Sequence, residues 1–317
     1  MSQHDPGWRR IKCGRGFRYV DAAGDALRPD EVERVRALVI PPAWSEVWIC
    51  PDDRGHLQAV GTDDAGRRQY LYHPVWREKR DLAKFDRVLT MARKLPNVRR
   101  RLVTDLNSTT DPRTRALATG VRLVDLGCFR PGSDSYTDEN GSRGLTTLEV
   151  GHVRRNGTGY VFEFVGKSGI EQDVRIVDAD VCRAVDLLVR RRATDARFLA
   201  AKNGRVWQPI GADALNEYIR DLFGLEVTAK DFRTWHATVT AAVALAGTER
   251  GATKAARARQ IRDAVVESAD LLGNTPTVAR SSYVHPRVLD LFEAGRTLPR
   301  VPKNQDAADR AVVRLLS

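Results

Sequence analysis

The stretch LLGNTPTVARSSYVHP, residues 271–286, holds the most informative pattern in the chain. Its Thr275-Pro276 pair is typical of a helix start, because threonine caps a first turn and proline suits the first helical position. We therefore predict a short helix after Asn274, with Tyr283 on it or beside it. A single helical tyrosine is usually a core or surface residue, so Tyr283 is a candidate nucleophile only together with partners elsewhere.

Two upstream segments supply such partners. The segment KDFRTWHAT, residues 230–238, puts Arg233 near the beginning of a long apolar helix that continues as VTAAVALAG. The segments GYVFEFV and QDVRIV read as two strands joined by a glycine-bearing turn, so we expect a hairpin with Lys167 at its tip. The order of lysine, arginine and tyrosine along the chain makes Tyr283 a stronger candidate.

The first part of the chain predicts a small strand-rich module. The strand candidates GFRYV, EVWIC and HLQAV surround one helix that begins at Pro29. The segment GRRQYLYHP reads as a turn followed by another strand. Apolar residues then recur at helical spacing. We place the domain boundary near Asp81, which gives domains of residues 1–81 and 82–317.

The second part reads as a mainly helical domain with a small inserted antiparallel sheet. Helical patterns cover residues 99–105 and 112–126, and the strand candidates LTTLEV, GYVFEFV and QDVRIV follow. Helices resume at Ala179 and dominate to the end. The two parts together predict an α+β protein, with a strand-rich N-terminal domain and a mainly α-helical catalytic domain.

The charge of the chain favours a polyanionic partner. Its 317 residues include 52 Lys and Arg against 41 Asp and Glu, which gives a formal net charge of +11 at pH 7. Most of the basic residues are arginine, whose planar fork matches phosphate oxygens two at a time. Phosphate binding also releases counterions from a duplex. A merely soluble basic protein would have the same composition.

Several other functions lack their motifs. Gly166-Lys167-Ser168 resembles the end of a phosphate-binding P-loop, but the leading glycine would fall at Val161. The histidines show no ligand spacing and no acidic cluster suggests a two-metal nuclease, so we expect a mechanism without metal or cofactor. The scattered cysteines predict reduced, mostly buried thiols. No segment is apolar enough to span a membrane, so we expect a cytoplasmic protein, nucleoid-associated if bacterial.

Taken in order, these residues resemble the catalytic set of the type IB DNA topoisomerases, particularly their compact poxvirus and bacterial branch. The first catalytic arginine of the family matches the arginine of GCFRPG, which lies just before a Gly-Leu-x-x-Leu segment. The matching positions are Arg130, Lys167, Lys230, Arg233, Asn274 and Tyr283. Many members have histidine where this chain has Asn274, and an amide donates a hydrogen bond without carrying charge.

The N-terminal part resembles the N-terminal domain of the bacterial members in IPPAWSEVWIC and GRRQYLYHP. In that family a Gln-Tyr-x-Tyr run contacts DNA bases, which implies the same role for Gln69, Tyr70 and Tyr72. Arg67 and Tyr136 are candidates for contacts with the DNA backbone in the same groove. The resemblance extends over about residues 8–295, which is nearly the whole chain.

The resemblance implies a nick-and-reseal reaction on double-stranded DNA without ATP or metal. Tyr283 attacks a phosphodiester and forms a 3′-phosphotyrosyl link, which conserves the bond energy for religation. The arginines and Asn274 stabilise the phosphate charge. Lys167 acts as the general acid, and Lys230 either assists proton transfer or contacts a phosphate. We expect a monomeric clamp on the DNA, and no protein partner follows from the sequence.

Two other functions stay open. A tyrosine recombinase or integrase uses the same tyrosine chemistry and the same hairpin lysine. Recombinases, however, usually carry histidine where this chain has Lys230, and their N-terminal domain is helical. A non-catalytic architectural DNA-binding protein would explain the charge and the tyrosines, but it does not require the ordered catalytic set. Lys230 and the predicted strands therefore favour the topoisomerase.

Overall fold

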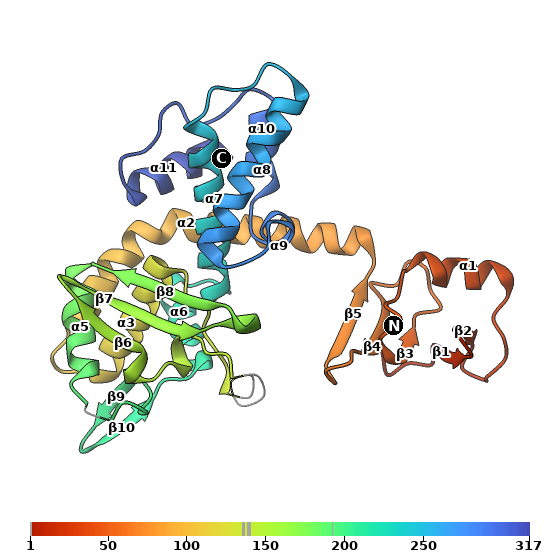
Figure 1. Cartoon of the computed structure of the whole chain (residues 1–317), viewed down its shortest axis with the longest axis horizontal. Coiled ribbons are helices and arrows are strands. Elements are labelled where there is room, and N and C mark those ends of the chain that lie inside the picture. The colour runs from red at the N-terminus through yellow and green to blue at the C-terminus, as the bar shows by residue number, and fades with distance from the viewer. Residues whose placement is uncertain (1, 135–136, 138–140, 192) are drawn as a thin grey trace. The chain divides into compact units, whose positions relative to one another are not determined.

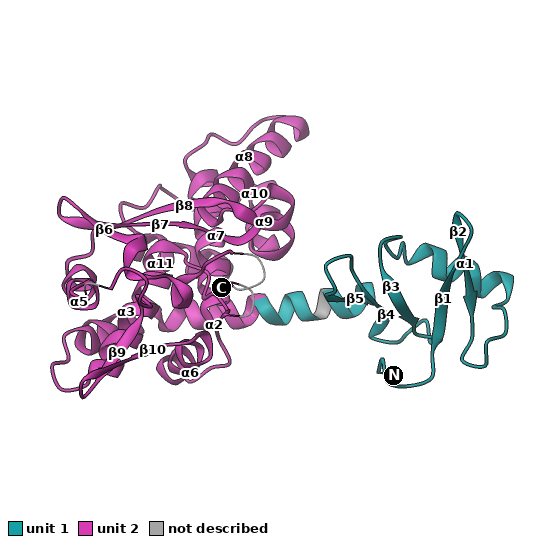
Figure 2. Cartoon of the chain, turned by 60° about the horizontal axis from the view of Figure 1, so that its bottom comes forward, with its two compact units in different colours: residues 1–84 teal, residues 85–317 magenta. Residues whose placement is uncertain are grey.

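The computed structural model of the chain describes residues 2–134, 137, 141–191 and 193–317. The chain forms two compact units, Met1–Lys84 and Phe85–Ser317 (Figures 1 and 2). Helix α2 (Pro74–Leu106) belongs to both units, so the boundary that we predicted near Asp81 lies inside a continuous helix. Each unit has a hydrophobic core of its own.

The first unit is built on a five-stranded antiparallel sheet with the strand order β2-β1-β3-β4-β5. Its elements are β1 (Trp8–Cys13), β2 (Gly16–Val20), α1 (Pro29–Ala37), β3 (Ser45–Ile49), β4 (Leu57–Thr62) and β5 (Arg68–Tyr72). The four strands and the helix predicted in this part are confirmed. The sequence analysis missed β1, because half of the segment WRRIKC is basic. Arg10 of that strand is nevertheless held, since its guanidinium donates to the carbonyl groups of Ile40, Pro41 and Trp44.

The second unit is mainly helical, as predicted, and Figure 1 shows its helices around two small sheets. The helices after α2 are α3 (Pro112–Gly127), α5 (Ala179–Val189), α6 (Ala212–Phe223), α7 (Ala229–Ala246), α8 (Lys254–Leu272), α9 (Pro276–Ser282), α10 (Pro286–Glu293) and α11 (Gln305–Leu316). One antiparallel sheet contains β6 (Val153–Asn156), β7 (Gly159–Val165) and β8 (Glu171–Ile176), and the other pairs β9 (Ala200–Asn203) with β10 (Val206–Pro209). The predicted α+β class is therefore confirmed.

The prediction of a strand over LTTLEV is wrong. This segment forms two short 3₁₀ helices, Leu145–Thr147 and Val150–His152. Its threonines bond to nearby carbonyl groups, and Thr146 bonds to Pro131 through both its amide and its hydroxyl group. The apolar and β-branched residues that suggested a strand are buried without pairing in a sheet.

The same segment fixes the backbone beside Arg130. The amide of Leu145 donates to the carbonyl oxygen of Arg130 at 2.9 Å. Gly132 and Gly144 allow this close approach, because a Cβ atom on Gly144 would lie 2.6 Å from the Cα atom of Gly132. Gly132 also has a φ of 91°, which side chains rarely tolerate.

Candidate active site

Tyr283 lies at the end of the short helix predicted from its sequence. Gly273 ends α8 in the left-handed conformation with a φ of 57°, and the Thr275 side chain then caps α9 through the amide of Val278 at 3.4 Å. Tyr283 is the C-cap residue of α9, and its amide donates to Ala279 at 3.0 Å. The turn of α9 therefore sets the position of the half-buried tyrosine.

Arg233 lies near the beginning of α7, as predicted, and is only 4% exposed. Its Nη1 donates to the carbonyl of Cys128, and its Nη2 donates to the carbonyl of Leu272 at 2.8 Å. The guanidinium carbon lies 5.6 Å from the centroid of the Tyr283 ring. Its Nε is buried and has no hydrogen-bond partner among the described residues. Arg233 is thus fixed by main-chain groups and retains an unused donor near Tyr283.

Arg130 is bonded to Asn274 and to the main chain just before it. Its Nη2 donates to the carbonyl of Gly273 at 3.2 Å and to Oδ1 of Asn274 at 2.8 Å. The Nδ2 of Asn274 is buried and has no partner among the described residues. Arg130 and Asn274 therefore form one unit, with an amide donor available.

The electrostatics of the site favour an anion. Burial lowers the pKa of both arginines, and the neighbouring charge of Arg233 lowers the pKa of Arg130 further. The side chains of Tyr283 and Cys128 act on Arg233 in the opposite direction. Within the described ranges, neither guanidinium forms an ion pair with a carboxylate. An anion such as a phosphodiester would stabilise both cations at once.

Three of the predicted residues, Arg130, Lys167 and Arg233, line one cavity of about 300 Å³. Lys167 stands on the exposed tip of the β7–β8 hairpin, as predicted. The cavity is also lined by Arg143, which pairs with Glu149 at 2.7 Å. The cavity is therefore lined by three arginines and one lysine, together with the acidic residues Glu171, Asp173 and Asp270.

Lys230 is not brought into this cluster. It is exposed in the first turn of α7, one turn before the buried Arg233, and it does not line the cavity. Its carbonyl accepts a hydrogen bond from Thr234 at 3.1 Å, whereas its ammonium group has no bond within the described part of the chain. The role predicted for Lys230 stays a prediction.

The residues predicted to contact DNA bases lie on β5 of the first unit. Asp63 accepts hydrogen bonds from Nε2 of Gln69 at 2.8 Å and from Nε of Arg67 at 3.0 Å. The main-chain amide of Arg67, together with these side chains, lowers the pKa of the Asp63 carboxyl group to about 2. Asp63 therefore holds both polar candidates. Tyr136 lies outside the described residues.

Aromatic side chains continue from β5 into the first turns of α2. The rings of Tyr70 and Tyr72 are stacked 6.2 Å apart, and those of Tyr72 and Trp76 are stacked 4.5 Å apart. His56 stacks on Trp76 at 5.8 Å, and the guanidinium of Arg80 lies 4.7 Å from the centroid of the same indole. Tyr70 is 41% exposed. The row offers ring surfaces for contact with nucleobases.

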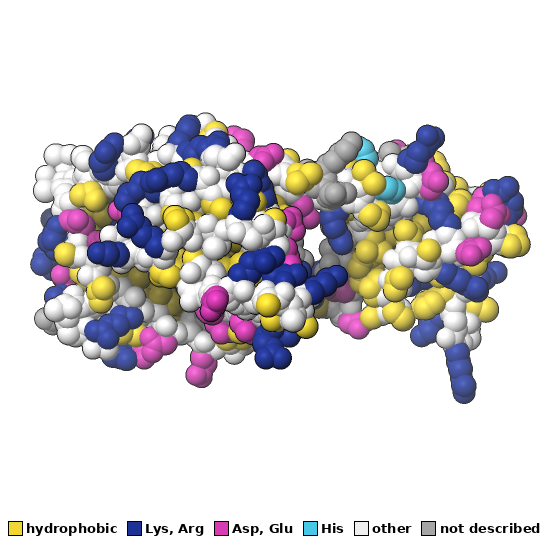
Figure 3. All heavy atoms as spheres, turned by 90° about the horizontal axis from the view of Figure 1, so that it is seen from above, with side chains coloured by type: hydrophobic (Ala, Val, Ile, Leu, Met, Phe, Trp, Pro, Cys, Tyr) yellow, Lys and Arg dark blue, Asp and Glu magenta, His cyan; other side chains and the backbone are white. Residues whose placement is uncertain are grey.

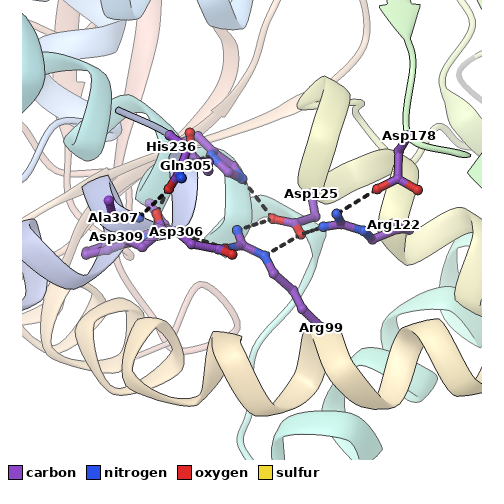
Figure 4. Close-up of polar contacts among 11 residues, drawn as sticks. Arg99, Arg122, Asp125, Asp178, His236, Gln305, Asp306, Ala307 and Asp309 are labelled. Carbon is purple, nitrogen blue, oxygen red and sulfur yellow. Dashed lines mark hydrogen bonds and ion pairs between the residues drawn. The ribbon is translucent and has the colours of Figure 1, made fainter. Parts of the chain in front are cut away.

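A buried network of charged and polar side chains connects α7 to the neighbouring helices (Figure 4). Its centre is Asp125 of α3, which is 3% exposed and binds Arg99, Arg122 and His236. Arg99 also binds Asp309 of α11 at 2.6 Å. Burial alone would raise the pKa of the Asp125 carboxyl group, but the hydrogen bonds from Arg99 and His236 and the charge of Arg99 hold this pKa far below its usual range. The network joins α2, α3, α7 and α11.

Sequence reasoning missed several residues that hold the site. Thr238 of α7 is 1% exposed and bonds to the carbonyl of Tyr283 and the amide of His285. A threonine in an apolar helix carries no signal for such a contact. Asp125 was equally inconspicuous, because its partners Arg99 and His236 are far away in the sequence. Asp63 was missed because its contact with Arg67 lies within a tight turn.

Metal and redox sites have no candidates among the described residues. No three side chains of His, Cys, Asp or Glu gather there as a metal ion would require. The cysteines are free thiols, with Cys13 exposed and Cys50, Cys128 and Cys182 buried, which confirms the prediction for this residue type. None of the described helices combines the length and the apolar character needed to cross a membrane.

Lys and Arg side chains are spread in several groups over the face of the second unit that Figure 3 shows, with fewer Asp and Glu side chains between them. This distribution agrees with the net charge of +11. An excess of basic side chains over acidic ones is typical of proteins that bind nucleic acids.

Comparison with known proteins shows the family of this chain. Residues 73–296 match the family described as eukaryotic DNA topoisomerase I, catalytic core, and residues 16–63 match bacterial DNA topoisomerase IB, N-terminal domain. DNA topoisomerase 1B of Acanthamoeba polyphaga mimivirus is 28% identical over 317 residues, which cover 95% of this chain and 91% of the viral protein. DNA topoisomerase 1B of vaccinia virus (strain Copenhagen) is 24% identical over 250 residues, or 77% of this chain and 75% of the viral protein. Because the match to the catalytic-core family covers well over half of the 317 residues of this chain, the chain belongs to the type IB DNA topoisomerase family.

Proposed function

We propose that this protein relaxes supercoiled duplex DNA by cutting one strand through a 3′-phosphotyrosyl intermediate and then religating it, without ATP or metal. The observation that carries the proposal is the position of Tyr283, whose ring centroid lies 5.6 Å from the guanidinium of the buried Arg233. A nucleophile next to fixed cations is the arrangement that phosphoryl transfer requires.

In the proposed cleavage step, the Tyr283 hydroxyl oxygen attacks the phosphorus atom and loses its proton to solvent. The bond from phosphorus to the DNA 5′ oxygen breaks, and Lys167 gives that oxygen a proton. Religation reverses the step, with the 5′ hydroxyl group as the attacking group and the tyrosine as the leaving group. The energy of the phosphodiester is conserved in the covalent link, so the cycle requires no nucleotide.

Charge stabilisation is assigned to Arg130, Arg233 and Asn274. The negative charge on the nonbridging oxygens changes as the reaction proceeds, and fixed donors stabilise it without reorganising. Removing one such donor costs about 3 kcal/mol, or on the order of a hundredfold in rate. The buried Nε of Arg233 and Nδ2 of Asn274 support this assignment, because neither donor has a partner among the described residues.

Binding of duplex DNA is assigned to both units. Gln69, Tyr70 and Tyr72 are proposed to contact bases, and Arg67 and Tyr136 to contact the backbone. We propose that one copy of the chain closes around the duplex as a clamp, and sedimentation of the protein with and without DNA tests this stoichiometry.

Lys230 is proposed to assist the proton transfer of Lys167.

The decisive experiment incubates the purified protein with supercoiled plasmid in EDTA without ATP. Relaxed topoisomers are expected, together with a covalent DNA adduct that survives denaturation. Tyr283→Phe is the matched control, because it retains the ring but loses the nucleophile, and it is expected to bind DNA without forming the adduct. Persistence of the supercoils with wild-type protein would overturn the proposal.

A further inference from the structure

Helices α3 and α7 are joined by two contacts that lie one helical turn apart. Arg233 of α7 donates to the carbonyl of Cys128 just after α3. His236 of α7 contacts Asp125 of α3, with 3.2 Å between Nε2 and Oδ1. Residues three apart lie on the same face of a helix, so both contacts belong to one interface. The contact of His236 therefore helps to fix the rotation and register of the helix that carries Arg233.

Asp125 is a rigid partner in this interface. Its carboxylate accepts hydrogen bonds from Nε and Nη2 of Arg99, both at 2.8 Å, and from Arg122. Despite its burial, the pKa of the carboxyl group lies well below its ordinary value, mainly because of the hydrogen bonds and charge of Arg99. Figure 4 shows the side chains of Arg99, Arg122 and His236 converging on this one carboxylate. Because Asp125 is held by Arg99 of α2 and by Arg122 of its own helix, its carboxylate is a rigid hydrogen-bond acceptor for His236 of α7.

The hydrogen bonds indicate which nitrogen of His236 carries the proton. The Nε2 of Gln305 lies 3.5 Å from Nδ1 of His236 and also donates to Asp309 at 2.9 Å. An amide nitrogen can only donate, so Nδ1 accepts and the proton is on Nε2, facing Asp125. His236 is only 6% exposed, so water does not replace this bond easily.

We propose that His236 is a positioning residue that acts through Arg233. Its hydrogen bond to Asp125 holds α7 in the register at which Arg233 stabilises the reacting phosphate. This inference rests on the proposed function, in which Arg233 is a catalytic residue. A purely structural histidine would support the fold without a specific effect on the Arg233 step. The two roles therefore differ in their energetic coupling to Arg233.

The test is a double-mutant cycle on single-turnover cleavage of a DNA oligonucleotide by the full chain. His236→Leu removes the donor to Asp125, and we expect cleavage to slow by between about tenfold and a hundredfold, as for other misplaced catalytic groups. His236→Gln can still donate from its Nε2, and we expect cleavage within about threefold of wild type. In the Arg233→Ala background, His236→Leu should cause no further slowing, because the group that it positions is gone.

Tyr218→Phe is the matched control for loss of a buried hydrogen bond. The hydroxyl group of Tyr218 donates to Asp105 at 2.6 Å, and neither residue touches α7 through this bond. We expect this variant to lower the melting temperature without changing the cleavage rate. DNA affinity, measured by fluorescence anisotropy, should stay within about twofold for every His236 variant, because the expected effect is on the rate.

The possible outcomes are distinct. Equal slowing by His236→Leu in the wild-type and Arg233→Ala backgrounds would overturn the inference, and so would a His236→Leu enzyme with the wild-type rate. Loss of activity in His236→Gln equal to that in His236→Leu would also contradict it. If the wild-type protein forms no adduct, the proposed function fails and this inference fails with it. If the wild-type protein forms the adduct, but the effects of His236→Leu and Arg233→Ala on the cleavage rate are additive, only this inference is overturned and the proposed function stands.

Discussion

The guanidinium of Arg130 determines the orientation of the Asn274 amide. Nη2 of Arg130 lies 2.8 Å from Oδ1 of Asn274, and because arginine can only donate, the oxygen of the amide must face it. The nitrogen of the amide then points elsewhere, buried and without a partner among the described residues. We therefore predict that Asn274 acts as a neutral donor, at a position where the family resemblance implies histidine in many members.

This orientation predicts the effect of Asn274→Asp. The variant can pair with Arg130, so we expect it to fold, but it loses the donor and adds a negative charge near the phosphate. Single-turnover cleavage should slow by about a hundredfold or more. As a control, Asn274→His should remain active and become faster as the pH falls through about 6.5, where histidine gains its charge. The wild-type rate should show no such inflection, and an equal inflection in both would refute the assignment.

Thr238 provides a second prediction. Its Oγ1 accepts a hydrogen bond from the amide of His285 at 3.1 Å, and its single proton lies between the carbonyl oxygens of Thr234 at 2.8 Å and Tyr283 at 3.2 Å, so it contacts the main chain just after the proposed nucleophile. Thr238→Val keeps the shape but removes the hydroxyl group and its contacts, and we expect it to lower the free energy of unfolding by about 1–3 kcal/mol and to slow cleavage. Thr238→Ser should retain the hydroxyl contacts. Urea unfolding and adduct formation measure the two effects, and a Val variant with the wild-type cleavage rate would contradict the idea.

Lys167 provides a test of proton transfer. Lys167→Ala should slow cleavage of ordinary DNA by on the order of a hundredfold or more, because the 5′ oxygen then leaves without a proton. A substrate with sulfur at the 5′ bridging position should restore the rate, since a thiolate leaves without a proton donor. Arg130→Ala should not be rescued by the same substrate. If Lys167→Ala stays slow with the sulfur substrate, the lysine is a phosphate contact instead.

The hydrogen bond from Gln69 to Asp63 leads to a prediction about how Gln69 would contact DNA bases. With one of its amide protons donated to Asp63, Gln69 keeps an acceptor and a second donor, the pair that recognises adenine. Asp63→Ala should therefore weaken the sequence preference of cleavage, and it should have little effect in a Gln69→Ala background. Mapping of cleavage sites on random DNA measures both. A change of preference in Asp63→Ala that adds fully to that of Gln69→Ala would contradict the link.

The pKa of Asp63, lowered to about 2, also predicts a pH dependence. A depressed carboxyl pKa stabilises the folded state above the unfolded value of about 3.9, and this contribution is lost as the pH falls through 2. Between pH 5 and 9 the carboxylate stays ionised, so the preference set by Gln69 should not change over this range. Cleavage maps at both ends of the range test this, and a different preference at pH 5 would argue against it.

Thiol reactivity checks the geometry around Arg233. Burial raises the pKa of the Cys128 thiol to about 12, whereas Cys13 is exposed. Iodoacetamide at pH 8 should therefore modify Cys13 first and leave Cys128 unmodified until the protein is unfolded, as measured by mass spectrometry. Rapid alkylation of Cys128 in the folded protein would show that the end of α3, whose carbonyl holds Arg233, is open.

Local signals in the sequence were sufficient to predict the elements that carry the proposed catalytic residues. A threonine-proline pair marks the start of α9, and a glycine-bearing turn marks the hairpin of Lys167. These signals work because capping and turn formation involve residues only a few positions apart. The family resemblance supplied the roles of the residues, which local patterns do not specify.

The contacts that hold the arginines could not be predicted in this way. Arg233 donates to the main-chain carbonyl groups of Cys128 and Leu272, and any residue type at those two positions offers the same acceptor. The strand predicted over LTTLEV was wrong for a related reason, since its apolar residues are buried without pairing. The contacts of Arg233 and the conformation of LTTLEV both depend on which groups are buried together. That burial follows from tertiary structure rather than from local propensity.

The stacking of Trp76 on Tyr72 and His56 gives the first unit an optical signal of its own. An indole stacked on neighbouring rings and placed under the guanidinium of Arg80 has a fluorescence that depends on those neighbours. Nucleobases that meet Tyr72 would disturb the stack and change the emission. Subtracting the signal of a Trp76→Phe variant would isolate this component, so that docking of the first unit on DNA becomes visible in real time without any added dye.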